Sequence, residues 1–119
     1  MSKTIKKNPV LSELIREMKK LSIERKGNFW KKIALELERP SKNRRVVNIA
    51  RINKYANDNE IVVVPGKVLS SGELDKKITV CAYQFSEEAL KKININGKAL
   101  TLRELIKSNP KGANIRIIG

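Results

Sequence analysis

The sequence predicts a single α/β domain, and three observations lead to that class. The chain has 119 residues, of which 40% are hydrophobic, and this suits one domain with one core. The first third carries apolar residues at helical spacing. The remainder alternates short β-branched runs with short helical patterns, separated by turn residues. We expect the domain to span residues 8–119, after a basic tail at residues 1–7 that orders only when a partner binds.

The first two predicted elements are helices. Asn8–Pro9 has the form of an N-cap followed by proline at the first helical position. The residues expected to form the core-facing stripe of this first helix are Val10, Leu11, Leu14, Ile15, Met18 and Leu21. Gly27–Asn28 interrupts the pattern, and a second helix is predicted over residues 29–37. Trp30 lies on the apolar stripe of that helix, so we expect a core anchor, with base stacking as the alternative.

Strands and helices are predicted to alternate along the rest of the chain. The expected strands are residues 46–49, 61–64, 67–69, 78–83 and 115–118. Pro65–Gly66 is expected to end the second of these strands, as a type II turn. The expected helical segments are residues 50–55, residues 86–93 capped by Ser86, and a helix after Thr101 that Asn109–Gly112 stops. Thr101 and Glu104 have the spacing of a capping box.

The charge balance predicts a polyanionic partner. The chain has 26 basic and 12 acidic residues, a net charge of +14 and a pI of about 10.2. Residues 1–58 hold 16 of the basic and 6 of the acidic residues, so the excess is concentrated in the first half. The alternative is a lysine-rich solvated surface without a partner. We expect no membrane partner, because no segment approaches roughly 18 apolar residues. We also expect no signal peptide, because no apolar run follows the first lysines.

A cationic loop is predicted at residues 39–45, which read RPSKNRR. Four of these seven residues are basic and none is acidic, and the proline argues against a simple helix face. An apolar run from Val46 follows at once, so a packed element is expected to hold the loop in place. Like charges this close repel one another unless an anion lies against them, and phosphate is the anion we expect.

Common catalytic sites find no support in the composition. The chain has no histidine, which removes imidazole-based triads and the usual zinc sites. Cys81 is the only cysteine, so it forms no intrachain disulfide, and its apolar surroundings predict a buried, inert thiol in a reducing, intracellular setting. Gly66–Lys67 fails the phosphate-loop pattern, because Val68 follows the lysine and no glycine lies five residues earlier.

Paired acids do not change this conclusion. Glu87–Glu88 suits a helix start, where acidic side chains interact favourably with the helix dipole. Glu73 and Asp75 lie two positions apart in a predicted turn, and two carboxylates alone are weak support for a metal site. We therefore expect no enzymatic activity, no cofactor, no metal and no small-molecule substrate.

Aromatic residues are scarce, at 4% of the chain. Modules that recognise single-stranded RNA stack its bases on aromatic side chains, and no predicted strand carries such an array. The basic residues are instead spread over loops, a tail and helix faces. This distribution favours contacts to the phosphates of a folded RNA from several directions.

Several motifs resemble one ribosomal protein family. They are Asn8-Pro9-x-Leu11, Trp30, LERPSKNRRVVNIARI, VVVPGKVLSSGEL and the ending NPKGANIRII, and together they cover residues 8–118. The family belongs to the archaeal and eukaryotic large subunit and is the one numbered eighteen with the suffix e. The resemblance implies an irregular β-β-α superhelix preceded by two N-terminal helices, similar to the C-terminal part of the bacterial large-subunit protein numbered fifteen. It also implies a structural role bound to rRNA, without catalysis.

The resemblance assigns an RNA-facing role to Arg39, Pro40 and Lys42 of the basic loop, to Arg51 and to Lys67. One departure is Ser41, which stands where the family usually has a basic residue. The other predicted RNA-binding residues are Arg44 and Arg45 on charge alone, Gly66 for a close approach of the backbone, and Lys3, Lys6, Lys7 and Lys111.

These inferences predict a structural constituent of the large ribosomal subunit, located on the cytoplasmic ribosome. Its expected partners are large-subunit rRNA and neighbouring ribosomal proteins. One rival is a free-standing nucleic-acid architectural protein, which would bind duplex DNA comparably well. A second rival is an enzyme acting on RNA, for which Glu73 and Asp75 would have to be essential.

Overall fold

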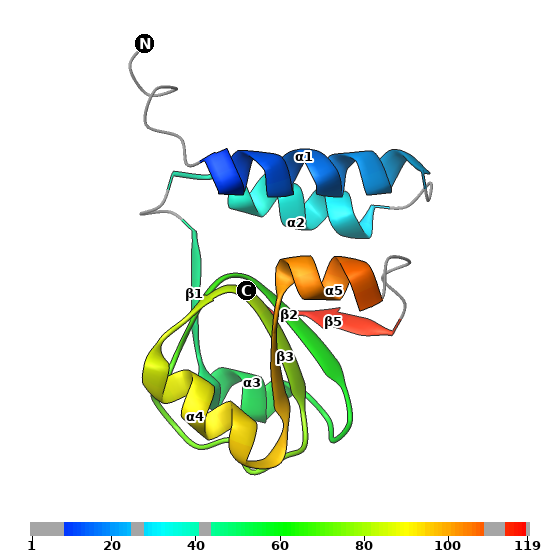
Figure 1. Ribbon diagram of the computed structural model, residues 1–119. Coiled ribbons are helices and arrows are strands. Elements are labelled where there is room, and N and C mark those ends of the chain that lie inside the picture. Colours follow the sequence, from blue (N-terminus) through cyan, green and yellow to red (C-terminus); the bar gives the residue numbers. More distant parts are fainter. Residues whose placement is uncertain (1–8, 25–27, 41–43, 109–113, 119) are drawn as a thin grey trace.

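The computed structural model describes residues 9–24, 28–40, 44–108 and 114–118. These residues form five helices and a five-stranded parallel sheet, and two helices precede the first strand (Figure 1). The α/β class and the two N-terminal helices predicted from the sequence are thereby confirmed. The helices are α1 (Pro9–Glu24), α2 (Phe29–Leu37), α3 (Ile49–Tyr55), α4 (Glu87–Asn96) and α5 (Leu102–Ser108). The strands are β1 (Arg45–Asn48), β2 (Ile61–Leu69), β3 (Thr79–Phe85), β4 (Lys98–Thr101) and β5 (Ile115–Ile117).

Strand β2 is the centre of the sheet. One of its edges pairs with β3, which pairs in turn with β4. Its other edge is shared by two short strands, because residues 61–63 pair with β5 and residues 66–69 pair with β1. The end of β1 at which the predicted basic loop arrives is therefore anchored to the second half of β2.

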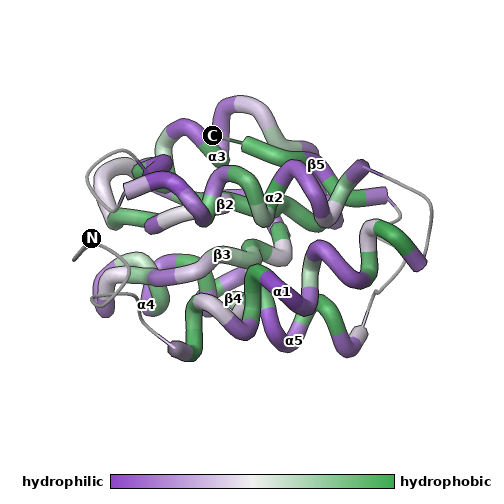
Figure 2. The backbone as a smooth tube through the Cα atoms, turned by 90° about the horizontal axis from the view of Figure 1, so that it is seen from above, coloured by the Kyte–Doolittle hydropathy of each residue, from purple (hydrophilic) through white to green (hydrophobic). Residues whose placement is uncertain are grey.

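Two apolar clusters lie on opposite faces of this sheet. Val62 and Val64 of β2 belong to the cluster beneath α3 and α4, whereas Val63 belongs to the cluster beneath α1, α2 and α5. This alternation follows from the two-residue period of a strand. Figure 1 shows α1 and α2 together at one end of the molecule and α3 and α4 at the other. Hydrophilic and hydrophobic residues alternate along α1 and α5 in Figure 2, as expected of helices with one buried face.

Local signals fixed most helix positions. Helix α1 begins at Pro9, while the predicted cap Asn8 lies outside the described residues. The Ser86 hydroxyl accepts a hydrogen bond from the Ala89 N–H at 3.1 Å, as a helix cap does. The predicted capping box is present at α5: the Glu104 N–H donates to the Thr101 hydroxyl at 3.1 Å, and the Thr101 N–H donates to the Glu104 carboxylate at 2.8 Å.

The apolar stripe of α1 was predicted one residue too wide. Leu11, Leu14 and Met18 are buried, whereas Val10 is 61% exposed. Val10 lies at the edge of this stripe, about 100° around the helix axis from Leu11 and in the first turn of α1. Trp30 of α2 is only 2% exposed and packs edge-on against Phe29, with ring centroids 4.8 Å apart. The prediction of a core anchor at Trp30 is confirmed.

The predicted turn at Pro65–Gly66 is wrong. Strand β2 continues through both residues, and its register against β3 shifts between Val64 and Lys67. Such an irregularity accommodates a proline, which has no N–H to donate to the ladder. A Cβ atom placed on Gly66 would lie 2.8 Å from the carbonyl carbon of Arg45, and closer still to its oxygen. Glycine therefore permits β1 and β2 to approach at this point.

Candidate nucleic-acid interface

Positive charge dominates the surface that the structure describes. All twelve acidic residues lie in the described part of the chain, whereas the segments outside it hold seven basic residues and no acidic one. The predicted contacts Lys3, Lys6, Lys7, Lys42 and Lys111 are among those seven and lie outside the described residues. The other predicted residues can be placed.

Arg44 directly precedes β1, and its side chain lies against the C-terminal end of α2 with the guanidinium turned toward the protein. Its Nε–H donates to the carbonyl oxygens of Leu37 at 3.2 Å and of Arg39 at 3.1 Å. These acceptors belong to the end of a helix and to the turn after it, where carbonyls lack intrahelical partners and a cation is favoured. The guanidinium carbon also lies 5.7 Å from the ring centroid of Tyr83, a cation–π distance. Arg44 thus fastens the end of the basic loop to α2 and β3.

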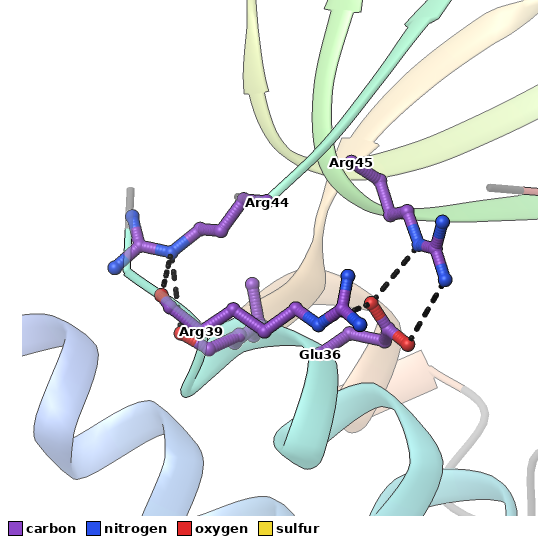
Figure 3. A network of polar contacts seen from close by, with 5 residues as sticks. Glu36, Arg39, Arg44 and Arg45 are labelled. Carbon is purple, nitrogen blue, oxygen red and sulfur yellow. Dashed lines mark hydrogen bonds and ion pairs between the residues drawn. The ribbon is translucent and has the colours of Figure 1, made fainter. Parts of the chain in front are cut away.

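Arg45 and Arg39 converge on one carboxylate, that of Glu36 in α2 (Figure 3). The Arg45 Nε–H donates to one Glu36 oxygen at 3.0 Å, and a terminal nitrogen of the same guanidinium lies 3.5 Å from the other oxygen. The Arg39 Nε lies 3.8 Å from the first oxygen. A carboxylate of the chain itself therefore lies against these like charges, whereas the anion expected from the sequence was phosphate.

Lys67 lies beside the end of the loop. In the sheet it stands opposite Val46 of β1 and Gln84 of β3, one position beyond the pairing of Gly66 with Arg45. The Lys67 side chain is exposed and has no hydrogen-bond or ion-pair partner within the described ranges. Pro40 is exposed as well, whereas Gly66 is buried against the backbone of Arg45. The fold therefore brings Arg39, Arg44, Arg45 and Lys67 to one end of the β1–β2 pair.

Arg51 is separated from this group. It lies on α3, on the opposite face of the sheet from α2 (Figure 1). Its guanidinium carbon lies 5.2 Å from the ring centroid of Tyr55, and the Lys54 ammonium lies 5.4 Å from the same ring. Arg116 of β5 faces this region and forms a two-pronged pair with Glu60, at 3.0 and 3.1 Å. The hydrogen bond from Arg116 lowers the pKa of the Glu60 carboxyl below its usual value.

The sequence did not identify Glu36, Tyr83 or Tyr55 as residues that contact these basic side chains. Glu36 had a usable signal, since it precedes Arg39 by three positions and such residues are neighbours on a helix. Tyr83 had none, because its contact with Arg44 joins residues that only the folded sheet brings together.

The described residues offer little for catalysis. They hold no group of three or more histidine, cysteine, aspartate or glutamate side chains that could bind a metal. Cys81 is buried, and this burial raises the pKa of its thiol to about 12, so the thiol stays protonated near neutral pH. The backbone N–H of Asp75 donates to the Asn53 side chain at 3.3 Å, a contact that joins a loop to α3. None of the described helices has the length and apolar character needed to cross a membrane.

The comparison with known proteins covers the entire chain. Residues 1–119 match the family described as ribosomal protein 60S L18 and 50S L18e. A protein of Methanothermobacter thermautotrophicus named large ribosomal subunit protein eL18 is 45% identical over 117 residues, which cover 98% of this chain and 97% of that protein. The proteins of the same name from Haloarcula marismortui and Methanoregula boonei are 45% and 43% identical, each over 99% of both chains.

Proposed function

The chain belongs to the family of ribosomal proteins 60S L18 and 50S L18e, and on this premise we propose that it binds folded large-subunit rRNA mainly through phosphate contacts and stabilises the tertiary structure of that RNA. The family confirms the predicted kind of protein, a constituent of the large ribosomal subunit and not an enzyme. The phosphate contacts, the RNA-binding residues and neighbouring ribosomal proteins as further partners are the proposed part.

The observation that carries the proposal is the excess of exposed basic side chains over acids that could neutralise them. Among the described residues, the exposed basic side chains without an ion pair include Arg16, Lys20, Lys31, Lys32, Lys67, Lys77 and Lys91. They come from α1, α2, β2, α4 and the loop before β3. Basic side chains on several helices and strands suit a partner whose phosphates surround the protein. Neutralising those phosphates releases their counterions, which favours binding.

The aromatic residues support phosphate recognition over the reading of unstacked bases. Trp30 is buried, and Phe29 and Phe85 pack against the two clusters. Tyr55 and Tyr83 each have a cationic side chain over the ring. No run of aromatic side chains thus lies open for stacking within the described residues, so affinity should depend on RNA shape more than on base sequence.

A salt titration of binding to large-subunit rRNA tests this proposal. Roughly 6 to 10 phosphate contacts predict a slope of about −4 to −9 in a plot of log K against log salt concentration. A slope near zero in a filter-binding assay contradicts the proposal. Duplex DNA of matched length is the control, because equal affinity for it would favour the architectural DNA-binding rival. Co-sedimentation with large subunits on a sucrose gradient provides the second measurement.

A further inference from the structure

We propose that the Glu36 carboxylate marks a phosphate site: when RNA binds, one backbone phosphate replaces this carboxylate between Arg39 and Arg45. This inference rests on the proposed function, and it assigns one of the phosphate contacts to two guanidinium groups. The carboxylate then serves as the counter-anion of the site in the free protein.

The geometry of the ion pairs supports an anion site. The Arg45 guanidinium contacts both Glu36 oxygens, through Nε at 3.0 Å and through a terminal nitrogen at 3.5 Å. The Arg39 Nε lies 3.8 Å from one of these oxygens. A planar guanidinium fork fits a carboxylate and a phosphate in the same two-pronged manner. Two arginines directed at one anion form a site that a phosphodiester can enter without rearrangement of the backbone.

Both arginines are held by the fold. Arg45 is the first residue of β1, where its backbone packs against Gly66 of β2. Arg39 follows the end of α2, and its carbonyl oxygen accepts the hydrogen bond from Arg44. Lys32 lies four residues before Glu36 in α2, so it is on the same side of the helix, and its side chain is exposed. The Glu36 carboxylate therefore pairs with two arginines and has a lysine on the same side of its helix, which leaves a local excess of positive charge.

Displacing Glu36 costs little because the pair is exposed. The side chains of Arg45 and Glu36 retain 42% and 28% of their accessible surface. Ion pairs at such positions contribute weakly to stability and are screened by salt. A phosphate of the RNA brings contacts of the same kind together with counterion release, which the internal carboxylate cannot supply. The exchange therefore favours the bound complex.

The chain contains a matched control for the test. Arg116 and Glu60 form a two-pronged pair with the same exposures, 42% and 28%, on the edge formed by β5. Glu36→Gln and Glu60→Gln each remove one acid, and they release Arg39 with Arg45 in the first case and Arg116 in the second. We expect Glu36→Gln to raise the affinity for large-subunit rRNA by roughly three- to tenfold, the scale of one or two exposed ion pairs. Glu60→Gln should raise it much less, and Arg45→Gln should abolish the gain from Glu36→Gln.

Equal gains from Glu36→Gln and Glu60→Gln would mean that only net charge matters, and they would overturn the site. An unchanged or lower affinity of Glu36→Gln would overturn it too. A second measurement needs no RNA: inorganic phosphate should shift the NMR signal of the Arg45 Nε–H in Glu36→Gln and leave the wild type nearly unaffected. If the wild type binds rRNA without salt dependence, the proposed function itself fails. If the wild type binds as expected and the two variants behave alike, only this site is lost.

Discussion

The interior of the sheet and the cationic end of its β1–β2 pair share strands but are held by different forces. The interior consists of two apolar clusters, and no polar or charged side chain among the described residues is buried. At the cationic end, Arg39, Arg44 and Arg45 are held by hydrogen bonds and exposed ion pairs. Apolar burial contributes strongly to stability, whereas exposed ion pairs contribute little. Substitutions in the two regions should therefore separate stability from RNA binding.

The largest effect on stability is expected from Trp30→Ala in the second cluster. The Trp30 side chain is almost fully buried, so its truncation should lower the free energy of unfolding by about 3 to 5 kcal/mol. Urea denaturation measures this change. RNA affinity should fall only as far as the folded fraction falls. Unchanged stability together with weaker RNA binding would identify Trp30 as a stacking residue and contradict its role as a core anchor.

A smaller effect is expected at the boundary between the two regions, from Gly66→Ala. The added methyl group would overlap the backbone of Arg45, so β1 must move away from β2. Such overpacking typically costs about 1 to 3 kcal/mol. Because Arg45 moves with β1, the affinity for large-subunit rRNA should fall as well.

The neighbouring variant Lys67→Ala is the control for Gly66→Ala. Lys67 is exposed, so its removal should leave the free energy of unfolding unchanged and make the salt slope shallower by about one unit.

Wild-type stability of Gly66→Ala would show that the contact between Gly66 and Arg45 does not constrain β1.

Predictions from the sequence succeeded where the cause is local. The capping box of Thr101 and Glu104 depends on residues three positions apart, and the burial of Trp30 follows from the stripe of its own helix. The continuation of β2 through Gly66 depends on Arg45, which is distant in the sequence, and the Pro–Gly pair by itself favours a turn. Strand β4 was not predicted, because its four residues become a strand only by pairing with β3.

The same distinction applies to the candidate site. The cationic character of residues 39–45 follows from their charge, and the RNA-binding role of Lys67, which stays a prediction, follows from the resemblance of its motif. The orientation of the arginines could not be predicted, because Arg44 turns to the carbonyl oxygens of α2 and to Tyr83. From the sequence, both Arg44 and Arg45 are expected to contact phosphate, and their joint replacement by alanine is expected to leave the fold intact. The contacts of Arg44 add a second role to be tested, that of holding the end of the loop against α2.

A smaller loss of stability than that of Gly66→Ala is expected from Arg44→Lys, and this variant distinguishes a positioning role from a phosphate contact. Lysine keeps the positive charge but lacks the Nε–H at this position and the planar group that lies over Tyr83. If Arg44 positions the loop, Arg44→Lys and Arg44→Gln should both lower the free energy of unfolding by about 1 kcal/mol, the usual contribution of a hydrogen bond.

Both variants should then bind large-subunit rRNA less tightly than the wild type, because the Arg39 carbonyl oxygen loses the hydrogen bond that it accepts from Arg44. The salt slope should stay at the wild-type value in Arg44→Lys, since no phosphate contact has been removed. A direct phosphate contact predicts a different pattern. In that case Arg44→Lys retains most of the affinity and all of the stability, whereas Arg44→Gln loses affinity and its slope becomes shallower by about one unit. Urea denaturation and filter binding on the two variants therefore decide whether Arg44 acts on the loop or on the RNA.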